Sequence, residues 1–317
     1  MTGAPSLSFQ DRPVTLSPGE TVLEALLRAG VETPHSCRAG QCQCCMLRAI
    51  EGAPPEESQR GLTEAQKALG FFLPCICRPT APLKIVPPDD AGAPQEATIQ
   101  AIEPLSEDVV RLRIETENFA YRPGQFLELI AEPGLSRHYS LASCPEEDPF
   151  LEMHVRLHPN GRMSRRLSAD LRAGDRLHIA GPRGTCFYEG VAADQPLTLI
   201  GAGTGLAPLY GVLRDALRRG HRGPIRLYHG ARDSKGLYLT DELQAFARAR
   251  DFAYIPATLD TGGDVAALAL AAEASRAAHT AFFLCGGENL VKRLKRDLFM
   301  AGASMKAIRS DAFTPAG

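Results

Sequence analysis

The chain has 317 residues, of which 44% are hydrophobic and 23% charged, a composition typical of a globular protein with two or three domains. The formal net charge is −2, so we expect neither a nucleic-acid nor a membrane-surface role. There is no basic segment followed by an apolar run at the start, and no apolar stretch approaches the ~18 residues of a membrane span. We therefore expect a cytoplasmic monomer whose nine cysteines serve as metal ligands or redox groups.

Residues 7–31 predict a hairpin followed by a helix. Thr21 and Glu24 have the T-x-x-E spacing of a capping box, in which side chain and backbone at a helix start bond reciprocally. Val22, Leu26 and Leu27 then give this helix an apolar face that can pack on a sheet.

A cluster of cysteines follows in the sequence SCRAGQCQCCMLRA. Cys37, Cys42 and Cys45 lie close together, and Cys75 follows much later in FFLPCIC. This C-x4-C-x2-C…C spacing is typical of plant-type [2Fe–2S] ferredoxins, in which one loop supplies three thiolates and a distant segment the fourth. The small residues between the first two cysteines would let backbone N–H groups approach the cluster.

Other kinds of cysteine site fit this pattern less well. A zinc site usually joins two C-x2–4-C pairs, and Cys75 and Cys77 are too close together to form the second pair. A Rieske centre needs two histidines, where only His35 lies nearby, and a structural disulfide suits a cytoplasmic protein poorly. Cys44 and Cys77 are then left over, and we expect Cys44 to be a small buried side chain that points away from the cluster.

In these features residues 1–88 resemble a plant-type ferredoxin domain. The resemblance implies a β-grasp fold and a bound [2Fe–2S] cluster. Its metal ligands would be Cys37, Cys42, Cys45 and Cys75. Such domains often carry glycine after the second ligand, where this chain has Gln43.

The rest of the chain divides into two further regions. The sequence IVPPDDAGAPQEA, residues 85–97, is rich in Pro, Gly, Ala and acidic residues and indicates a linker, which we place at residues 89–96. Short alternating segments such as VVRLRIE and QFLELIA predict an antiparallel barrel over residues 97–194. From residue 195 to 317, strands alternate with helices, which predicts an α/β domain with a mostly parallel sheet. The predicted fold class is therefore multidomain, α+β and α/β.

The barrel region contains SRHYSLAS and, further on, GRMSRRL. Gly161 permits a tight turn, and the backbone N–H groups after Ser164 would open a helix whose start can hold an anion. With RPGQF before them and GPRGTCFY after them, these motifs resemble the flavin domain of the ferredoxin–NAD(P)H reductase superfamily. That resemblance implies a Greek-key barrel that binds FAD.

The resemblance also implies which residues contact FAD. Arg137 would bind a flavin phosphate, Tyr139 would pack on the isoalloxazine ring, and Ser140 would hydrogen-bond near its reactive nitrogen. The other matching positions are His154, Val155 and Arg156 on the pyrophosphate side, and Gly161, Met163 and Ser164 in the phosphate-binding turn.

The sequence LTLIGAGTGLAPLYGVLRDALRRG predicts a strand, a glycine-rich turn and a helix. Glycines there let the backbone reach a dinucleotide pyrophosphate, and the helix start favours its negative charge. The spacing is G-x-G-x-G and differs from the Rossmann G-x-G-x-x-G. It is similar to the motif in the Rossmann-like nucleotide domain of the same superfamily, which makes Gly203, Thr204 and Gly205 nucleotide-binding residues.

Two later segments complete the resemblance. A strand ends at Cys285 and Gly286, and in the resembled family this turn lies beside the nicotinamide, so Cys285 would pack near the hydride path without being a nucleophile. Family members often finish with an acidic residue and an aromatic residue that covers the flavin, and Asp311 and Phe313 match these positions. Ser140, Cys285 and Asp311 would then surround the site of hydride transfer.

The sequence distinguishes less clearly between NADH and NADPH. Arg232, Ser234 and Lys235 could hold the 2′-phosphate of NADPH. Because a similar segment occurs in NADH-using relatives, we expect NADH, with NADPH as the alternative.

The three regions suggest one electron path. A nicotinamide gives up two electrons as hydride and a [2Fe–2S] centre carries one at a time, whereas FAD can exchange electrons in both ways. The whole chain resembles the reductase components of bacterial oxygenases, of the benzoate-dioxygenase and methane-monooxygenase type. We expect electrons to pass from NAD(P)H through FAD to the cluster, and on to an oxygenase component or another one-electron acceptor protein. The alternatives are a reductase that serves a deoxysugar dehydratase, a quinone or ferric iron, and a redox-sensing iron–sulfur protein.

Overall fold

The structure is a computed structural model that describes residues 5–314. The chain forms two compact units, Met1–Asp90 and Ala91–Gly317. Within the described range, no helix combines the length and the apolar character needed to cross a bilayer.

The first unit is built on a mixed five-stranded sheet with the strand order β2-β1-β5-β3-β4. β1 runs parallel to β5, and the other neighbouring strands are antiparallel. The strands are β1 (Leu7–Phe9), β2 (Arg12–Val14), β3 (Leu47–Glu51), β4 (Phe71–Phe72) and β5 (Leu83–Val86). This is the β-grasp arrangement that the sequence predicts for a ferredoxin domain.

Helix α1 (Val22–Arg28) packs on this sheet, and a shorter helix, α2 (Glu64–Ala68), precedes β4. The predicted capping box is present, because Thr21 accepts a bond from the Glu24 N–H and Glu24 accepts one from the Thr21 N–H. Val22 and Leu26 lie in one apolar core with residues of the sheet such as Ile85. The capping box thus fixes where the helix begins, and the apolar side chains of Val22 and Leu26 set the face that it buries.

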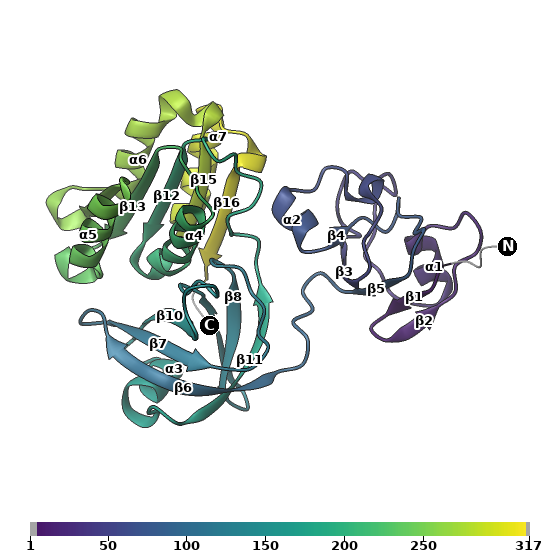
Figure 1. Cartoon of the computed structure of the whole chain (residues 1–317), viewed down its shortest axis with the longest axis horizontal. Coiled ribbons are helices and arrows are strands. Elements are labelled where there is room, and N and C mark those ends of the chain that lie inside the picture. The colour runs from purple at the N-terminus through teal and green to yellow at the C-terminus, as the bar shows by residue number, and fades with distance from the viewer. Residues whose placement is uncertain (1–4, 315–317) are drawn as a thin grey trace. The chain divides into compact units, whose positions relative to one another are not determined.

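The second unit begins with an antiparallel sheet in the order β10-β7-β6-β11-β8-β9. A bridge between Leu141 and Met153 joins the two outer strands and makes the sheet a partly closed barrel (Figure 1). The strands are β6 (Gln95–Pro104), β7 (Val109–Glu115), β8 (Phe126–Glu132), β9 (Leu135–Ser140), β10 (Leu151–Arg156) and β11 (Arg176–Arg183). A short helix, α3 (Arg162–Arg165), follows β10.

A parallel five-stranded sheet in the order β14-β13-β12-β15-β16 completes the second unit. The strands are β12 (Leu197–Ala202), β13 (Ile225–Ala231), β14 (Ala253–Thr258), β15 (Ala281–Gly287) and β16 (Ile308–Phe313). Four main helices cover its two faces: α4 (Leu206–Arg218) and α5 (Thr240–Arg250) on one, and α6 (Val265–Glu273) and α7 (Glu288–Met300) on the other (Figure 1). The chain reverses direction across the sheet between β12 and β15, so ligands are expected beyond the carboxyl ends of these two strands.

Candidate functional site

The loop that carries the first cysteines directs backbone N–H groups at one thiol. The N–H groups of Ala39, Gln41 and Cys42 lie 3.4, 3.4 and 3.3 Å from Cys37 Sγ. These bonds, that of Ala39 foremost, lower the pKa of Cys37 to about 6. A thiol that ionises readily and is surrounded by N–H donors suits a metal-bound thiolate.

The four predicted ligands form two pairs of interacting thiols. Cys37 and Cys42 are exposed, and their thiols interact with each other. Cys45 and Cys75 are buried in an apolar cluster, where burial, together with the nearby Cys75 thiol, raises the pKa of Cys45 to about 12. Two thiol pairs, one at the surface and one in an apolar layer, fit a cluster with two irons, because each iron needs two protein ligands.

The shape of this loop depends on two residues with left-handed backbone. Gly40 has φ +72°, and a Cβ there would lie 2.6 Å from the Ile76 side chain, beside the fourth cysteine. Gln43 has φ +58°, in the position where related domains often have glycine, and its side-chain amide donates to the Gly61 carbonyl at 3.3 Å. That hydrogen bond supports a conformation that costs a non-glycine residue energy.

Of the two leftover cysteines, one departs from the sequence-based expectation. Cys77 is fully buried in the core of the first unit. Cys44 is exposed, and its thiol lies 3.7 Å from the Cys42 carbonyl, so the prediction that Cys44 is a buried apolar side chain is wrong. The loop stays at the surface here because its backbone turns at Gln43, which removes the strand alternation that the prediction assumed.

A cavity of about 600 Å³ lies in the second unit, where β9, β10 and α3 approach the turn after β12 and the last strand. Many of the residues predicted to contact FAD or the hydride path line this cavity. They are Arg137, Tyr139, Ser140, His154, Arg156, Gly161, Met163, Ser164, Thr204, Asp311 and Phe313. The structure therefore brings together side chains from five distant segments that the sequence motifs identify separately.

Other predicted residues do not line the cavity. Val155 points into the barrel core, because neighbouring residues of a strand face opposite sides. Gly203 and Gly205 lie in the turn after β12, and Gly286 lies at the carboxyl end of β15. A Cβ at Gly205 would lie 2.3 Å from the Cys285 carbonyl oxygen. The Cys285 thiol is fully buried and lies 3.6 Å from Cys186 Sγ, so it faces the core and not the cavity wall.

The cavity wall also contains residues that sequence reasoning missed. These are Phe126, Glu128, Ser136, His138, His158, Arg162, Ala207, Ala312 and Thr314. Several come from the hairpin of β8 and β9, in which Phe126 pairs with Ser140 and Glu128 with His138. The residues of β8 can be placed at the cavity only when their pairing with β9 is known. The motif around Arg137 does not determine that pairing.

Two arginines give the cavity a cationic side. Arg137 makes no ion pair with any carboxylate in the described part of the chain, and its guanidinium donates only to the adjacent Ser136 carbonyl. Arg156 lies 3.4 Å from Asp108, but its Nε has no hydrogen-bond partner, and a Cβ at Gly203 would lie 3.1 Å from its Nη2. Cationic groups with unused donors beside glycine turns suit the phosphates of a dinucleotide.

At the other end of the cavity a serine and a carboxylate meet. Ser140 Oγ donates to Asp311 Oδ2 at 2.9 Å, which joins the barrel to the last strand of the parallel sheet. Burial raises the pKa of Asp311 above its usual value, and the Ser140 hydrogen bond offsets part of that rise. Tyr139 lies beside them, and burial raises its pKa to about 12, so it stays a neutral aromatic surface.

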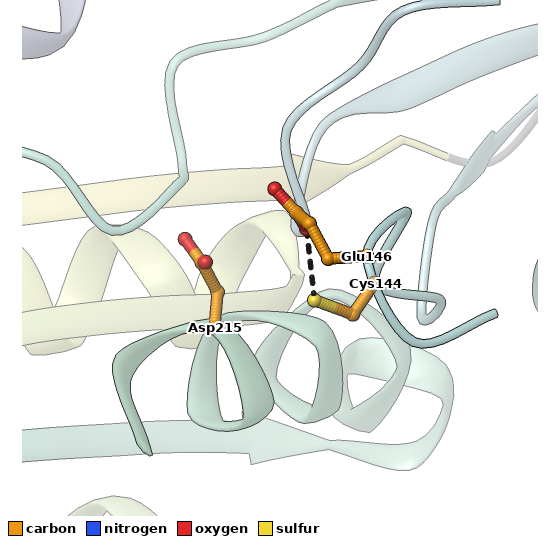
Figure 2. Close-up of side chains that lie close together, drawn as sticks. All are labelled: Cys144, Glu146 and Asp215. Carbon is orange, nitrogen blue, oxygen red and sulfur yellow. Dashed lines mark hydrogen bonds between the residues drawn. The ribbon is translucent and has the colours of Figure 1, made fainter. Parts of the chain in front are cut away.

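A third group of possible metal ligands lies away from both sites. Cys144, Glu146 and Asp215 bring their ligand atoms within 4.8 Å of one another, with Asp215 on α4 (Figure 2). Arg218 already bonds Asp215 at 2.8 Å and approaches Glu146 at 3.3 Å, and burial raises the pKa of Cys144 to about 11. A guanidinium thus pairs with both carboxylates, and the thiol stays protonated. We therefore interpret this group as a contact between the barrel and α4.

Comparison with known families agrees with this division of the chain. Residues 9–80 match the 2Fe-2S iron-sulfur cluster binding domain, residues 96–188 the oxidoreductase FAD-binding domain and residues 199–295 the oxidoreductase NAD-binding domain.

Several relatives match this chain over nearly their whole length. The reductase subunit of an aromatic O-demethylase from Amycolatopsis sp. is 33% identical over 98% of this chain and 99% of its own length. The reductase component of a naphthalene 1,2-dioxygenase system from Pseudomonas putida is 31% identical over 97% of each chain. The crystal structure of an Amycolatopsis cytochrome P450 reductase superposes with a TM-score of 0.67 and 31% identity, covering 99% of this chain and all of that one (100%).

The matched ranges contain the cysteine loop and most of the segments that line the cavity. The chain belongs to the ferredoxin–NAD(P)H reductase family with an N-terminal [2Fe–2S] domain, and it is an NAD(P)H-dependent oxidoreductase that passes electrons from NAD(P)H through FAD to the cluster.

Proposed function

We propose that this protein is the reductase component of an oxygenase system and that it takes its electrons from NADH. The observation that carries the proposal is the single cavity in which the flavin motifs of the barrel meet the nucleotide turn and the last strand. Support for an oxygenase as acceptor comes from relatives that are named as reductases of an aromatic O-demethylase and of dioxygenases.

In this proposal the cavity holds FAD between the barrel and the parallel sheet. FAD would supply the step between a two-electron hydride donor and a one-electron cluster. Arg137 and Arg156 bind the phosphates, helped by the turn at Gly161 and Ser164, and Tyr139 packs on the ring. Ser164 also fixes that turn, since its hydroxyl accepts the His158 N–H at 2.8 Å.

Ser140 and Asp311 act at the reacting end of the cavity. The Ser140 hydroxyl donates to Asp311 Oδ2 while that carboxylate is ionised. When Asp311 takes up a proton, its carboxyl can donate to Ser140 Oγ instead, which frees the hydroxyl proton for a bond to a ring nitrogen. Burial makes proton uptake by Asp311 easier, because its carboxylate is poorly solvated. Cys285 contributes through the shape of its turn, and Phe313 closes the cavity near the end of the chain.

An acidic residue near the nucleotide turn supports NADH. Asp260 follows β14, and its backbone N–H donates to the Arg232 carbonyl at 3.1 Å, so the residue that carries this carboxylate is bonded to the segment of the predicted 2′-phosphate site. Such a carboxylate can accept hydrogen bonds from ribose hydroxyls and repels a phosphate.

We further propose the boundaries 1–88, 89–96, 97–194 and 195–317 for the ferredoxin domain, linker, barrel and nucleotide domain. The ranges that match the three family models support them. We also propose that the protein works in the cytoplasm as a monomer, where NADH is available and where its nine cysteines, all free in the structure, stay reduced.

The test is a reconstituted electron path. Purified protein should be brown, with flavin and cluster absorption, and should reduce cytochrome c faster with NADH than with NADPH. Adding oxygenase components encoded near its gene should give NADH-dependent product formation with one of them. Normal cytochrome c reduction without turnover of any such oxygenase would contradict the proposed acceptor.

A further inference from the structure

A buried hydrogen bond crosses from the barrel to the nucleotide-binding sheet next to the cavity. His154 on β10 lines the cavity, and its Nδ1 lies 3.1 Å from the hydroxyl of Tyr238. Tyr238 lies between the 3₁₀ turn Ser234–Gly236 and α5, so it belongs to the segment that leaves the carboxyl end of β13. The two residues are 3% and 2% exposed, so the bond is shielded from bulk solvent.

The surrounding charges determine which atom carries the proton. His154 Nε2 lies 3.1 Å from Glu152, which is paired with Arg113 at 2.9 Å and Arg111 at 3.4 Å. Although burial raises the pKa of Glu152, the bonds from His154 and the arginines lower it to about 2, so Glu152 is an anion. Nε2 therefore carries the proton and donates to Glu152, and Nδ1 accepts from the Tyr238 hydroxyl.

On its other side Tyr238 contacts the nucleotide domain. Its ring meets the His154 and His229 rings edge-on, with centroids 5.2 and 5.4 Å apart. His229 is on β13, directly beside Gly201 of β12, which leads into the glycine turn. Tyr238 is thus held between a cavity residue and the strand next to the nucleotide turn.

We propose that the Tyr238 hydroxyl is a positioning group. Through its bond to His154 it holds the nucleotide-binding sheet in a fixed position relative to the flavin cavity, as hydride transfer requires. The inference rests on FAD lying in that cavity. Hydride transfer needs the donor and acceptor atoms about 3–3.5 Å apart, and a shift of about 1 Å can cost about 100-fold in rate. A buried bond between the two halves of the site is placed to prevent such a shift.

The test compares two tyrosines that each lie beside a histidine. Tyr238→Phe removes the bond between barrel and sheet. Tyr254→Phe is the matched control, because the Tyr254 hydroxyl lies 3.2 Å from His229 Nδ1 within the nucleotide sheet alone. Full-length variants are mixed anaerobically with NADH, with FAD in excess, and the limiting rate of flavin bleaching is measured separately from the NADH dissociation constant.

We expect Tyr238→Phe to lower the limiting rate about 10- to 100-fold with little change in NADH binding, and Tyr254→Phe to leave the rate near that of the wild type. His154→Phe should lower the rate as much as Tyr238→Phe does. His154→Asn should keep part of the rate, because its amide oxygen can accept the bond from Tyr238. The double variant Tyr238→Phe/His154→Phe should be no slower than either single variant.

Wild-type rates in Tyr238→Phe, equal losses in both tyrosine variants, or additive losses in the double variant would overturn the inference. A wrong placement of FAD would give a different result. In that case Arg137→Ala would bind FAD as tightly as the wild type does.

Discussion

The cysteine loop and the flavin cavity are assembled in opposite ways. The loop takes three of its four thiols from one short segment, and its geometry comes from local backbone, such as the left-handed Gly40 and Gln43. The cavity takes its side chains from five segments, and its geometry depends on bonds between them, such as Ser140 to Asp311 and His154 to Tyr238. A local site should therefore fail when one ligand is lost, whereas an assembled site should fail when its packing is disturbed.

The largest effect is expected from Cys42→Ser. Loss of one of four thiolates should remove the cluster and abolish cytochrome c reduction, while NADH–ferricyanide activity, which needs only the flavin, remains. Cys44→Ser is the control, since Cys44 is an exposed thiol in the same loop outside the predicted ligand set. Iron content, visible absorption and the two activities are the measurements; equal loss of both activities would show that the electron path runs differently.

Glu152→Gln should weaken the assembled site selectively. Glu152 has a folded pKa of about 2, below its usual value of 4.5, so its contribution to stability is present above about pH 4.5 and lost as the pH falls towards 2. We expect the variant to be about 3 kcal/mol less stable than the wild type at pH 7, with the difference vanishing near pH 2. Denaturant-induced FAD release should shift at pH 7 and cluster bleaching should not; a shift in both would contradict the separation of the two regions.

Arg137→Ala tests the cationic end of the cavity. A charge-assisted hydrogen bond to a phosphate contributes about 1.5–3 kcal/mol, so FAD should bind about 10- to 100-fold more weakly. Arg176→Ala is the matched control, because Arg176 lies in the same barrel but pairs with Glu96 at the exposed edge. Titration of the stripped protein with FAD, followed by flavin fluorescence, gives both affinities, and equal values for the two variants would exclude Arg137 from the flavin site.

The smallest effect is expected from Asp260→Ser. Removing the carboxylate of Asp260, whose backbone bonds that of Arg232, should raise kcat/KM for NADPH relative to NADH about tenfold, or about 1.4 kcal/mol. Arg232→Ser is the companion variant and should not improve NADPH use, because it removes the cation available to a 2′-phosphate. Steady-state cytochrome c reduction with each nucleotide measures the ratio, and an unchanged ratio in Asp260→Ser would remove the support for NADH.

The sequence predicted the local features of both regions closely. The capping box at Thr21 and Glu24 forms as expected, and the predicted segment VVRLRIE is the strand Val109–Glu115. These features depend on periodicity and capping within a few residues, and such information is present in any single segment.

Cys44 was missed for a local reason, the turn at Gln43, whereas the other misses depend on contacts between distant segments. Phe126 and Glu128 reach the cavity only through the register of β8 on β9. Cys285 has the right turn, but its thiol faces Cys186, from a segment 99 residues away in sequence. Tyr238 carries no motif, and its role emerges only when β10 and the segment after β13 are seen together. Such contacts are tertiary, and no local pattern encodes them.

The most direct test of the electron path is anaerobic reduction of the full-length protein by NADH, followed by EPR of the frozen sample. A [2Fe–2S] cluster held by Cys37, Cys42, Cys45 and Cys75 should take up about one unpaired electron per chain. That signal should disappear in protein stripped of FAD and return when FAD is added back. A cluster that stays oxidised while the flavin bleaches, or one that is reduced by NADH without any flavin, would contradict the path from nicotinamide through FAD to the cluster.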